Sequence, residues 1–136
     1  MEIEAVGRVE STIRGKGDVR SKRDDVARVV VYDRYAELLH RIEEHEELDI
    51  IFRFHKLDEW RATARPFGDP SNPEYGTFAT RSPFRPNFLG VTRVRLVGRE
   101  GNVLLVRGLD AFDGSPVIDI KPSGWPPERF KDLARD

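Results

Sequence analysis

The chain has 136 residues, enough for one compact domain, and we expect a single domain over residues 1–136. It contains no cysteine, which excludes disulfides, thiolate metal sites and cysteine nucleophiles and fits a reducing cytoplasm, the compartment that we expect. Its 23 basic and 24 acidic residues leave a net charge of −1, which argues against a protein whose whole surface binds nucleic acid. No apolar stretch approaches the roughly 20 residues of a membrane helix, so we expect no membrane association.

The N-terminal part of the chain predicts two strands and a helix. Residues 3–9 form the expected first strand, and residues 14–20 an expected mobile loop. The β-branched run at residues 27–32 predicts a short strand that is buried on both faces. Four apolar side chains then recur at helical spacing: Tyr35, Leu38, Leu39 and Ile42. That stripe predicts a short helix, for which Asp33 is the expected N-cap.

The middle of the chain predicts a strand followed by a long loop. Residues 48–55 alternate, and one face of this strand carries four apolar side chains: Leu48, Ile50, Phe52 and Phe54. Residues 60–75 contain three prolines and predict an irregular loop, a feature that is usually functional or disordered at this length. A further short strand is expected at residues 77–80.

The C-terminal part predicts a hairpin and a last strand. Residues 91–97 and 103–109 form the expected hairpin, with its turn at residues 99–102. Residues 117–121 form the last strand, and the tail beyond Pro122 is expected to hold a turn of helix. About seven short strands and one helix favour a mainly β fold, a small antiparallel β-barrel with one or two short α-helices.

Two patterns that suggest cofactor or metal sites have plainer explanations. Gly15 and Gly17 begin a G-x-G-x-x-G pattern, but Arg20 stands at the third glycine position and no βαβ unit surrounds it. His40 and His45 are five residues apart, so they do not share a helical face, and we expect no metal site there.

Three aspartates near the C-terminus allow two interpretations. Asp110, Asp113 and Asp119 could bind Mg²⁺ as a carboxylate cluster. Asp113 and Gly114 also form a turn signal, in which the aspartate caps its own backbone. Asp119 lies in the last expected strand, where a carboxylate would be buried or paired.

The basic residues are segregated along the chain. No acidic residue lies between Glu74 and Glu100, where five arginines fall: Arg81, Arg85, Arg93, Arg95 and Arg99. A second basic stretch spans residues 14–23. A neutral protein can thereby offer a phosphate a positive face, although solvated charges on a heavily charged surface are the alternative.

Arg81, Arg85 and His55 are the candidate site residues that the local sequence supports. The two arginines lie in a segment with Pro83 and Pro86, which favour extended backbone and exclude a helix. Guanidinium groups held in this way suit a carboxylate or phosphate ligand, and they could also pair with the region of the aspartates. His55 ends a strand on its polar face, where it is either a surface histidine or a site residue.

Two long runs, residues 76–90 and 109–122, crowd charged side chains beside glycine and proline, as a preformed ligand pocket requires. They read G-T-F-A-T-R-S-P-F-R-P-N-F-L-G and L-D-A-F-D-G-S-P-V-I-D-I-K-P. Together with the strand that ends in Phe54-His55, they resemble the TsaA-like family, whose best-known branch is the TrmO-type tRNA methyltransferases. The resemblance covers most of residues 1–122.

This resemblance implies a β-barrel that binds S-adenosylmethionine, works as a homodimer with the site near the subunit interface, and methylates N6 of the t6A nucleoside at tRNA position 37. The cofactor-binding residues that it implies are His55, Lys56, Arg81, Ser82, Arg85, Asn87, Leu109, Asp110, Asp113, Gly114, Ser115 and Pro116. His55 is the expected catalytic base, because it is the only histidine placed to take a proton from N6. Arg20, Arg93 and Arg95 are the expected RNA contacts.

The chain departs from the family pattern at several positions. Phe88-Leu89 stands where many members have Pro-Ile, and Thr92 where serine is common. Bacterial members carry a Pro-Arg-Gln segment at the cofactor site, and this chain has residues 18–21 there, with Arg20 as the candidate equivalent. The chain ends soon after the second motif, so we do not expect the additional C-terminal domain of some relatives.

Three functional hypotheses follow. The first is an S-adenosylmethionine-dependent tRNA methyltransferase, for which the protein contributes positioning and electrostatics. The alternative is a non-catalytic module that keeps the barrel and binds a nucleotide or RNA through its arginines. A metal-dependent hydrolase that uses the three aspartates is the third, and it predicts a requirement for a divalent ion.

Overall fold

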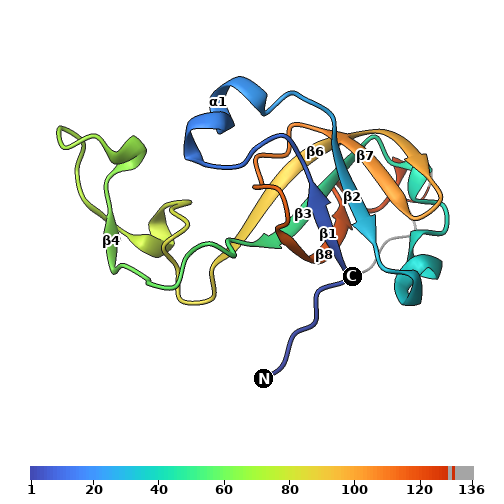
Figure 1. The fold of residues 1–136 in the computed structure, drawn as a ribbon, viewed down its shortest axis with the longest axis horizontal. Coiled ribbons are helices and arrows are strands. Elements are labelled where there is room, and N and C mark those ends of the chain that lie inside the picture. Colours follow the sequence, from blue (N-terminus) through green and yellow to red (C-terminus); the bar gives the residue numbers. More distant parts are fainter. Residues whose placement is uncertain (129, 131–136) are drawn as a thin grey trace.

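The computed structural model describes residues 1–128 and 130. Six antiparallel strands close into a barrel (Figure 1). Their order around the barrel is β1 (Gly7–Glu10), β2 (Ala27–Val31), β7 (Val103–Arg107), β6 (Leu89–Glu100), β3 (Glu47–Arg53) and β8 (Pro116–Pro122). A separate two-stranded sheet pairs β4 (Thr63–Ala64) with β5 (Tyr75–Gly76). The prediction of a mainly β fold with a small antiparallel barrel is confirmed.

Short helical turns connect these strands. The turns η1 (Lys16–Asp18) and α1 (Val19–Lys22) lie between β1 and β2, so part of the expected loop at residues 14–20 is helical. The 3₁₀ helices η2 (Asp33–Leu39) and η3 (Ile42–Glu44) join β2 to β3. Two further 3₁₀ turns, η4 (Pro66–Gly68) and η5 (Thr77–Ala79), lie between β3 and β6.

The core fills the inside of the barrel with one face of each strand. On β3 the alternation is confirmed, since Leu48, Ile50 and Phe52 are buried. They pack in one cluster with buried residues of the other strands, among them Val9, Val29, Val94, Leu104, Val106 and Val117. Full burial of a side chain of this size contributes about 1.5–3 kcal/mol to stability, so this shared interior holds the strand ends in place.

Two local predictions about residues 27–42 are wrong. Strand β2 is not buried on both faces, because a barrel has solvent outside it and Arg28 is exposed there. The apolar stripe forms two 3₁₀ helices that are separated at Arg41, whose φ of 69° is left-handed. In the tighter 3₁₀ helix Leu38 points to solvent, with 76% of its surface exposed. The expected N-cap, Asp33, is the first helical residue, and Tyr32 holds the N-cap position.

The bounds of several other elements differ from the prediction. The first strand begins at Gly7, and the strand expected at residues 77–80 is the 3₁₀ turn η5, closed by a hydrogen bond from Thr80 N to Thr77 O. The hairpin of residues 91–109 is confirmed as β6 and β7, and the last strand as β8. The turn of helix expected in the tail lies partly outside the described residues. In the part of the chain that the structure describes, no helix is long and apolar enough to span a membrane.

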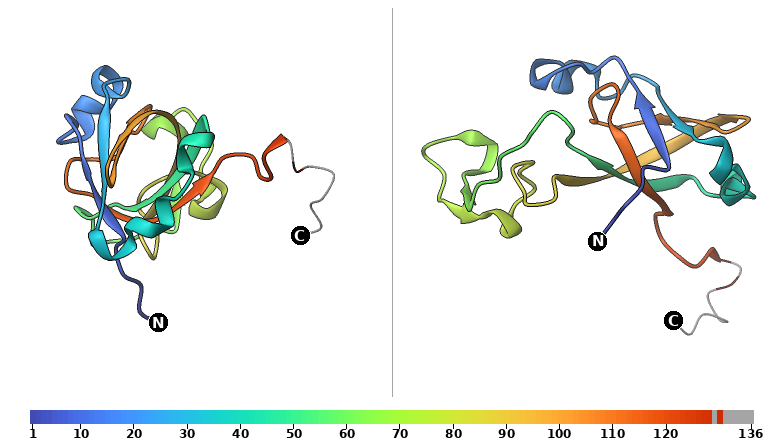
Figure 2. Two further views of the ribbon diagram at one scale, coloured as in Figure 1. Left: turned by 90° about the vertical axis from the view of Figure 1, so that its right-hand side faces the viewer. Right: turned by 60° about the horizontal axis from the view of Figure 1, so that its bottom comes forward.

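The strand order brings three connections together at one end of the barrel, which we call the site end. They are residues 11–26, 54–88 and 108–115, as the pairing of Arg53 with Leu89, Ala27 with Val106 and Arg8 with Pro116 requires. Most of the second connection, residues 56–88, projects away from the barrel, green to yellow in Figures 1 and 2. We call residues 56–88 the arm. The helices η2 and η3 lie at the opposite end.

Candidate functional site

A groove of about 1000 Å³ opens at the site end, and both the barrel and the arm contribute residues to its lining. Its charged residues are Arg23, Asp49, Arg81, Arg85, Arg93 and Asp110. Four of these six side chains are cationic, so the groove is electropositive although the whole chain is nearly neutral. A concave site of this sign suits an anionic ligand.

Two arginines of the first motif run are held by backbone carbonyl oxygens. Arg81 Nη2 donates to Val91 O on strand β6. Arg85 Nη1 donates to Thr80 O at 3.0 Å and to Ser82 O at 2.9 Å. Within the described residues neither guanidinium forms an ion pair, so the alternative in which these arginines pair with the aspartates is not formed. Both positive charges therefore lie in the groove, oriented but without a compensating carboxylate.

Asp110 is the acidic residue that the second motif run places in the groove. Thr92 Oγ1, which is nearly buried on β6, donates to Asp110 Oδ1 at 2.6 Å. The adjacent Leu109 is buried in the core and anchors the backbone at this position. Strand β6 thus orients both charged residues, Asp110 through the Thr92 hydroxyl and Arg81 through the Val91 carbonyl.

Two packed aromatic rings belong to the apolar lining of the groove. Phe52 and Phe54 pack edge to face, with ring centres 5.2 Å apart and an interplanar angle of 74°. Both line the groove beside Gly90. A Cβ on Gly90 would lie 2.6 Å from Phe54 Cζ and 2.9 Å from Phe52 Cζ, so only glycine lets the two rings approach strand β6 this closely.

His55 lies in a second group, which we call the His55 cluster: Arg14, His55, Lys56, Asp113, Gly114 and Ser115. Ser115 Oγ donates its proton to Phe112 O at 2.6 Å. Its contact with His55 Nδ1, at 3.4 Å, must therefore be one in which the serine oxygen accepts. Nδ1 then carries the imidazole proton, and Nε2 keeps the lone pair that a general base needs.

The charges around His55 favour its neutral form. Partial burial lowers the pKa of His55 from its ordinary value of 6.5, and the positive charges of Lys56 and Arg53 lower it further, against a smaller opposing effect of Asp113. Lys56 is fixed in place, since its Nζ donates to Arg14 O at 2.7 Å and lies 5.3 Å from the centre of the Phe112 ring.

Asp113 links this cluster to the loop that precedes η1. Its Oδ1 accepts from Ser11 N at 3.0 Å, and its Oδ2 lies 3.7 Å from Arg14 Nη1. The turn at Asp113 and Gly114 is confirmed, with φ of 85° at Gly114, but the Asp113 carboxylate caps the backbone of Ser11 rather than its own. The loop of residues 11–14 and the second motif run are therefore held as one unit.

The three aspartates of the hydrolase hypothesis do not form a cluster. Asp110 is bonded to Thr92, Asp113 to the loop before η1, and Asp119 to Lys121 at 3.3 Å. Asp119 is thus paired, but it is half-exposed rather than buried. Among residues 1–128 and 130, no group of three acidic, histidine or cysteine side chains could hold a metal ion.

The remaining predicted residues have mixed positions. Ser82 is used within its own turn, where its Oγ accepts from Phe84 N. Ser115 and Leu109 are buried, Asn87 is exposed, and Pro116 begins β8. Of the three expected RNA contacts, Arg93 lines the groove and lies 3.6 Å from Asp49, whereas Arg20 and Arg95 are exposed outside it.

Most residues that line the groove were not predicted as site residues, and Arg23 and Phe67 are two of them. Arg23 lies in the basic stretch at residues 14–23, so the segregation of basic residues along the chain indicated this region without singling out Arg23. Phe67 lies in the irregular loop, and nothing in its local sequence distinguishes it from other exposed aromatics.

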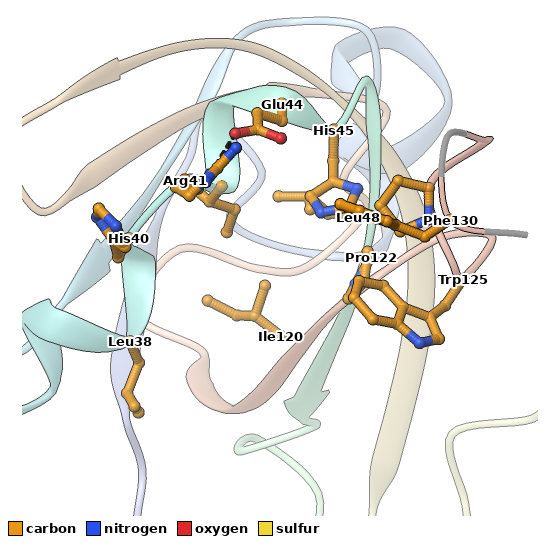
Figure 3. A pocket seen from close by; sticks show the side chains of 12 residues that line it. Leu38, His40, Arg41, Glu44, His45, Leu48, Ile120, Pro122, Trp125 and Phe130 are labelled. Carbon is orange, nitrogen blue, oxygen red and sulfur yellow. Dashed lines mark hydrogen bonds and ion pairs between the residues drawn. The ribbon is translucent and has the colours of Figure 1, made fainter. Parts of the chain in front are cut away.

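A second pocket, of about 400 Å³, lies at the opposite end of the barrel (Figure 3). Its lining includes His40, His45 and Trp125, and the rings of His45 and Trp125 are 6.3 Å apart. It contains none of the site residues that the sequence predicted.

Comparison with known proteins shows which sequences and structures this chain resembles. Residues 17–124 match the sequence profile of the tRNA-methyltransferase O N-terminal domain. An S-adenosyl-L-methionine-binding protein of Archaeoglobus fulgidus is 39% identical over 124 residues, which cover 89% of this chain and 88% of that protein. The tRNA (adenine(37)-N6)-methyltransferase of Escherichia coli is 37% identical over 134 residues, which cover 89% of this chain and 57% of the enzyme.

A solved structure is similar over the whole chain. The crystal structure of TrmO from Pseudomonas aeruginosa aligns with a TM-score of 0.72 and 26% sequence identity, covering 100% of this chain and 60% of that one. The chain thus spans somewhat more than half the length of the Escherichia coli enzyme and of this structure. Since the profile covers most of residues 1–136 and the fold agrees, the chain belongs to the TrmO N-terminal domain family, also called TsaA-like.

Proposed function

We propose that the chain binds S-adenosylmethionine in the groove at the site end and transfers a methyl group to N6 of t6A at position 37 of a tRNA. The observation that carries this proposal is the pair of arginines, Arg81 and Arg85, held in the groove by carbonyl oxygens and without a carboxylate partner among the described residues. Relatives named as S-adenosyl-L-methionine-binding proteins support the choice of cofactor.

The residues of the groove fit the chemical groups of this cofactor. A guanidinium of Arg81 or Arg85 can hold the carboxylate of the methionyl part through charge-assisted hydrogen bonds. The second carboxylate oxygen of Asp110, Oδ2, has no partner within the described residues and can accept from an ammonium or a ribose hydroxyl. When bound, the cofactor supplies an electrophilic methyl group on a sulfonium.

The chain then has to orient the acceptor and remove a proton from N6. His55 is the proposed base, because its lowered pKa keeps it neutral and Ser115 leaves Nε2 free to accept a proton. His55 does not itself line the groove, but it directly follows Phe54, which does. The acceptor nucleoside would therefore lie across the edge of the groove at Phe54.

We further propose a homodimer in the cytoplasm, with the site near the subunit interface. The arm carries Trp60, Tyr75 and Phe78, which are 61%, 44% and 83% exposed. Large apolar side chains exposed together on one projecting segment are typical of a surface that another protein covers. Arg20, Arg93 and Arg95 are the proposed contacts with RNA phosphates, and Arg93 is the one of the three that lines the groove.

A second candidate function is a module that binds the cofactor or RNA without catalysis. It is favoured by one observation: the only proposed base lies outside the lining of the groove. In that case the arginines would serve binding alone.

Titration of the purified chain with S-adenosylmethionine and S-adenosylhomocysteine, followed by methyl transfer to tRNA that carries t6A, tests both. Binding together with transfer supports the methyltransferase. Binding without transfer to any tRNA supports the module, and a folded chain that binds neither nucleoside contradicts the proposed cofactor site.

A further inference from the structure

We propose that Phe67 is a stacking platform for a nucleobase at the lip of the groove, a role that rests on the proposed function and assigns a ligand-binding residue outside both motif runs. Phe67 lines the groove together with Arg23, Arg81 and Arg85. The base belongs either to the adenosine of the cofactor or to an unpaired nucleotide of the RNA, and both offer the same planar ring.

The first support is the rigidity of the arm around Phe67. Asn72 Nδ2 donates to Pro66 O at 2.9 Å, and Arg65 Nη1 donates to Asn72 O at 2.6 Å. Gly68 N donates to Arg65 O at 2.9 Å, which closes the turn over Phe67. Asp69 Oδ1 accepts from the backbone and the hydroxyl of Ser71. The tip of the arm is therefore a hydrogen-bonded frame rather than a loose loop.

The second support is that this frame holds Phe67 in an unfavourable state. Its φ of 58° and ψ of 15° are left-handed, a conformation that a bulky side chain rarely adopts. The residue is also fully exposed, at 103% of its reference surface. An apolar ring presented to water on strained backbone contributes nothing to folding, and strain of this kind clusters at ligand sites.

The third support is the chemistry that surrounds the ring. The groove combines an exposed phenylalanine with four arginines, of which Arg93 is paired with Asp49 while Arg23, Arg81 and Arg85 form no ion pair within the described residues. Aromatic rings that stack bases beside arginines that hold phosphate or carboxylate are the usual pair of contacts in proteins that bind nucleotides and single strands. An aliphatic or purely apolar partner would leave these guanidinium groups desolvated and without an anion.

The test compares Phe67→Ala with Phe67→Trp, which keeps an aromatic face, and with Tyr32→Ala. Tyr32 is an exposed aromatic at the N-terminus of η2, at the opposite end of the barrel, and it does not line the groove. Each protein is titrated with S-adenosylhomocysteine and, separately, with an anticodon stem-loop RNA that carries t6A. Stacking on one ring predicts that Phe67→Ala weakens one of the two affinities about 5- to 150-fold, while Phe67→Trp and Tyr32→Ala stay within about twofold of wild type.

The outcomes are distinct. A loss of affinity for S-adenosylhomocysteine alone identifies the cofactor adenine, and a loss for the RNA alone identifies an RNA base. Unchanged affinities for both ligands overturn the inference, as does a loss that Phe67→Trp fails to restore. A changed oligomeric state in Phe67→Ala with unchanged affinities also overturns it, because the ring then serves a subunit contact. If the wild-type chain binds neither probe, the proposed function fails first and the inference falls with it.

Discussion

Gly90 sets how closely strand β6 approaches the aromatic floor of the groove, and its replacement by alanine has a calculable effect. The added methyl carbon would lie 2.6 Å from Phe54 Cζ and 2.9 Å from Phe52 Cζ, whereas carbon atoms in contact are about 3.5–4.0 Å apart. Both rings would have to retreat by about 1 Å, and they are already packed edge to face. The overlap therefore disturbs the floor of the groove as well as the barrel.

The magnitude follows from two opposing effects. Overpacking of this kind costs about 1–3 kcal/mol, while alanine in place of glycine in a strand recovers about 0.5–1 kcal/mol. Gly98 provides a matched control on the same strand, because an alanine methyl there meets Leu105 Cδ1 at 3.4 Å. We expect Gly90→Ala to be less stable than Gly98→Ala by about 1–3 kcal/mol, which corresponds to a melting temperature roughly 3–10 °C lower.

Thermal unfolding followed by circular dichroism measures this difference, and titration with S-adenosylhomocysteine measures the effect on the groove. Gly90→Ala should weaken binding because Phe54 moves, and Gly98→Ala should leave it unchanged. If Gly90→Ala melts at or above the temperature of Gly98→Ala and binds as the wild type does, the steric argument is wrong.

Three further predictions concern the site. Arg81→Ala should weaken S-adenosylhomocysteine binding about 10- to 100-fold, which is the value of a charge-assisted hydrogen bond. Arg34→Ala, in η2 at the other end of the barrel, should leave this affinity unchanged. If Arg81→Ala binds as tightly as the wild type, Arg81 does not belong to the site. Lys56→Met removes a positive charge that lowers the pKa of His55, so the pKa of His55 should rise. The acid limb of the pH–rate profile of methyl transfer should then move to higher pH, because the base must be unprotonated to act. An acid limb that does not move would exclude His55 as the base. Ser115→Ala deletes a buried hydroxyl with two hydrogen-bond contacts, so chemical denaturation should show a free energy of unfolding lower by about 1–3 kcal/mol. In steady-state kinetics the substitution should change kcat more than KM. An unchanged kcat would refute the role of Ser115 in orienting the imidazole.

Elements with a strong apolar period were predictable from the sequence. The alternation of residues 48–54 determined which face of β3 is buried, and the β-branched hairpin at 91–109 determined β6 and β7. The segment at residues 33–44 was not predictable in detail. Its apolar stripe fits an α-helix, but Arg41 breaks it into 3₁₀ turns and Leu38 points to solvent, because packing against the barrel end outweighs helix propensity.

By itself the sequence determined the family, the barrel class and the two motif runs, because these depend on residue order and short periods. Only the tertiary structure decided how the predicted site divides, with Arg81, Arg85 and Asp110 in the groove and His55 in a cluster beside it. It also placed Phe67 at the groove, although its neighbours in the chain give no such signal. The physical reason is that barrel closure, set by long-range strand pairing, brings together loops that are far apart in sequence.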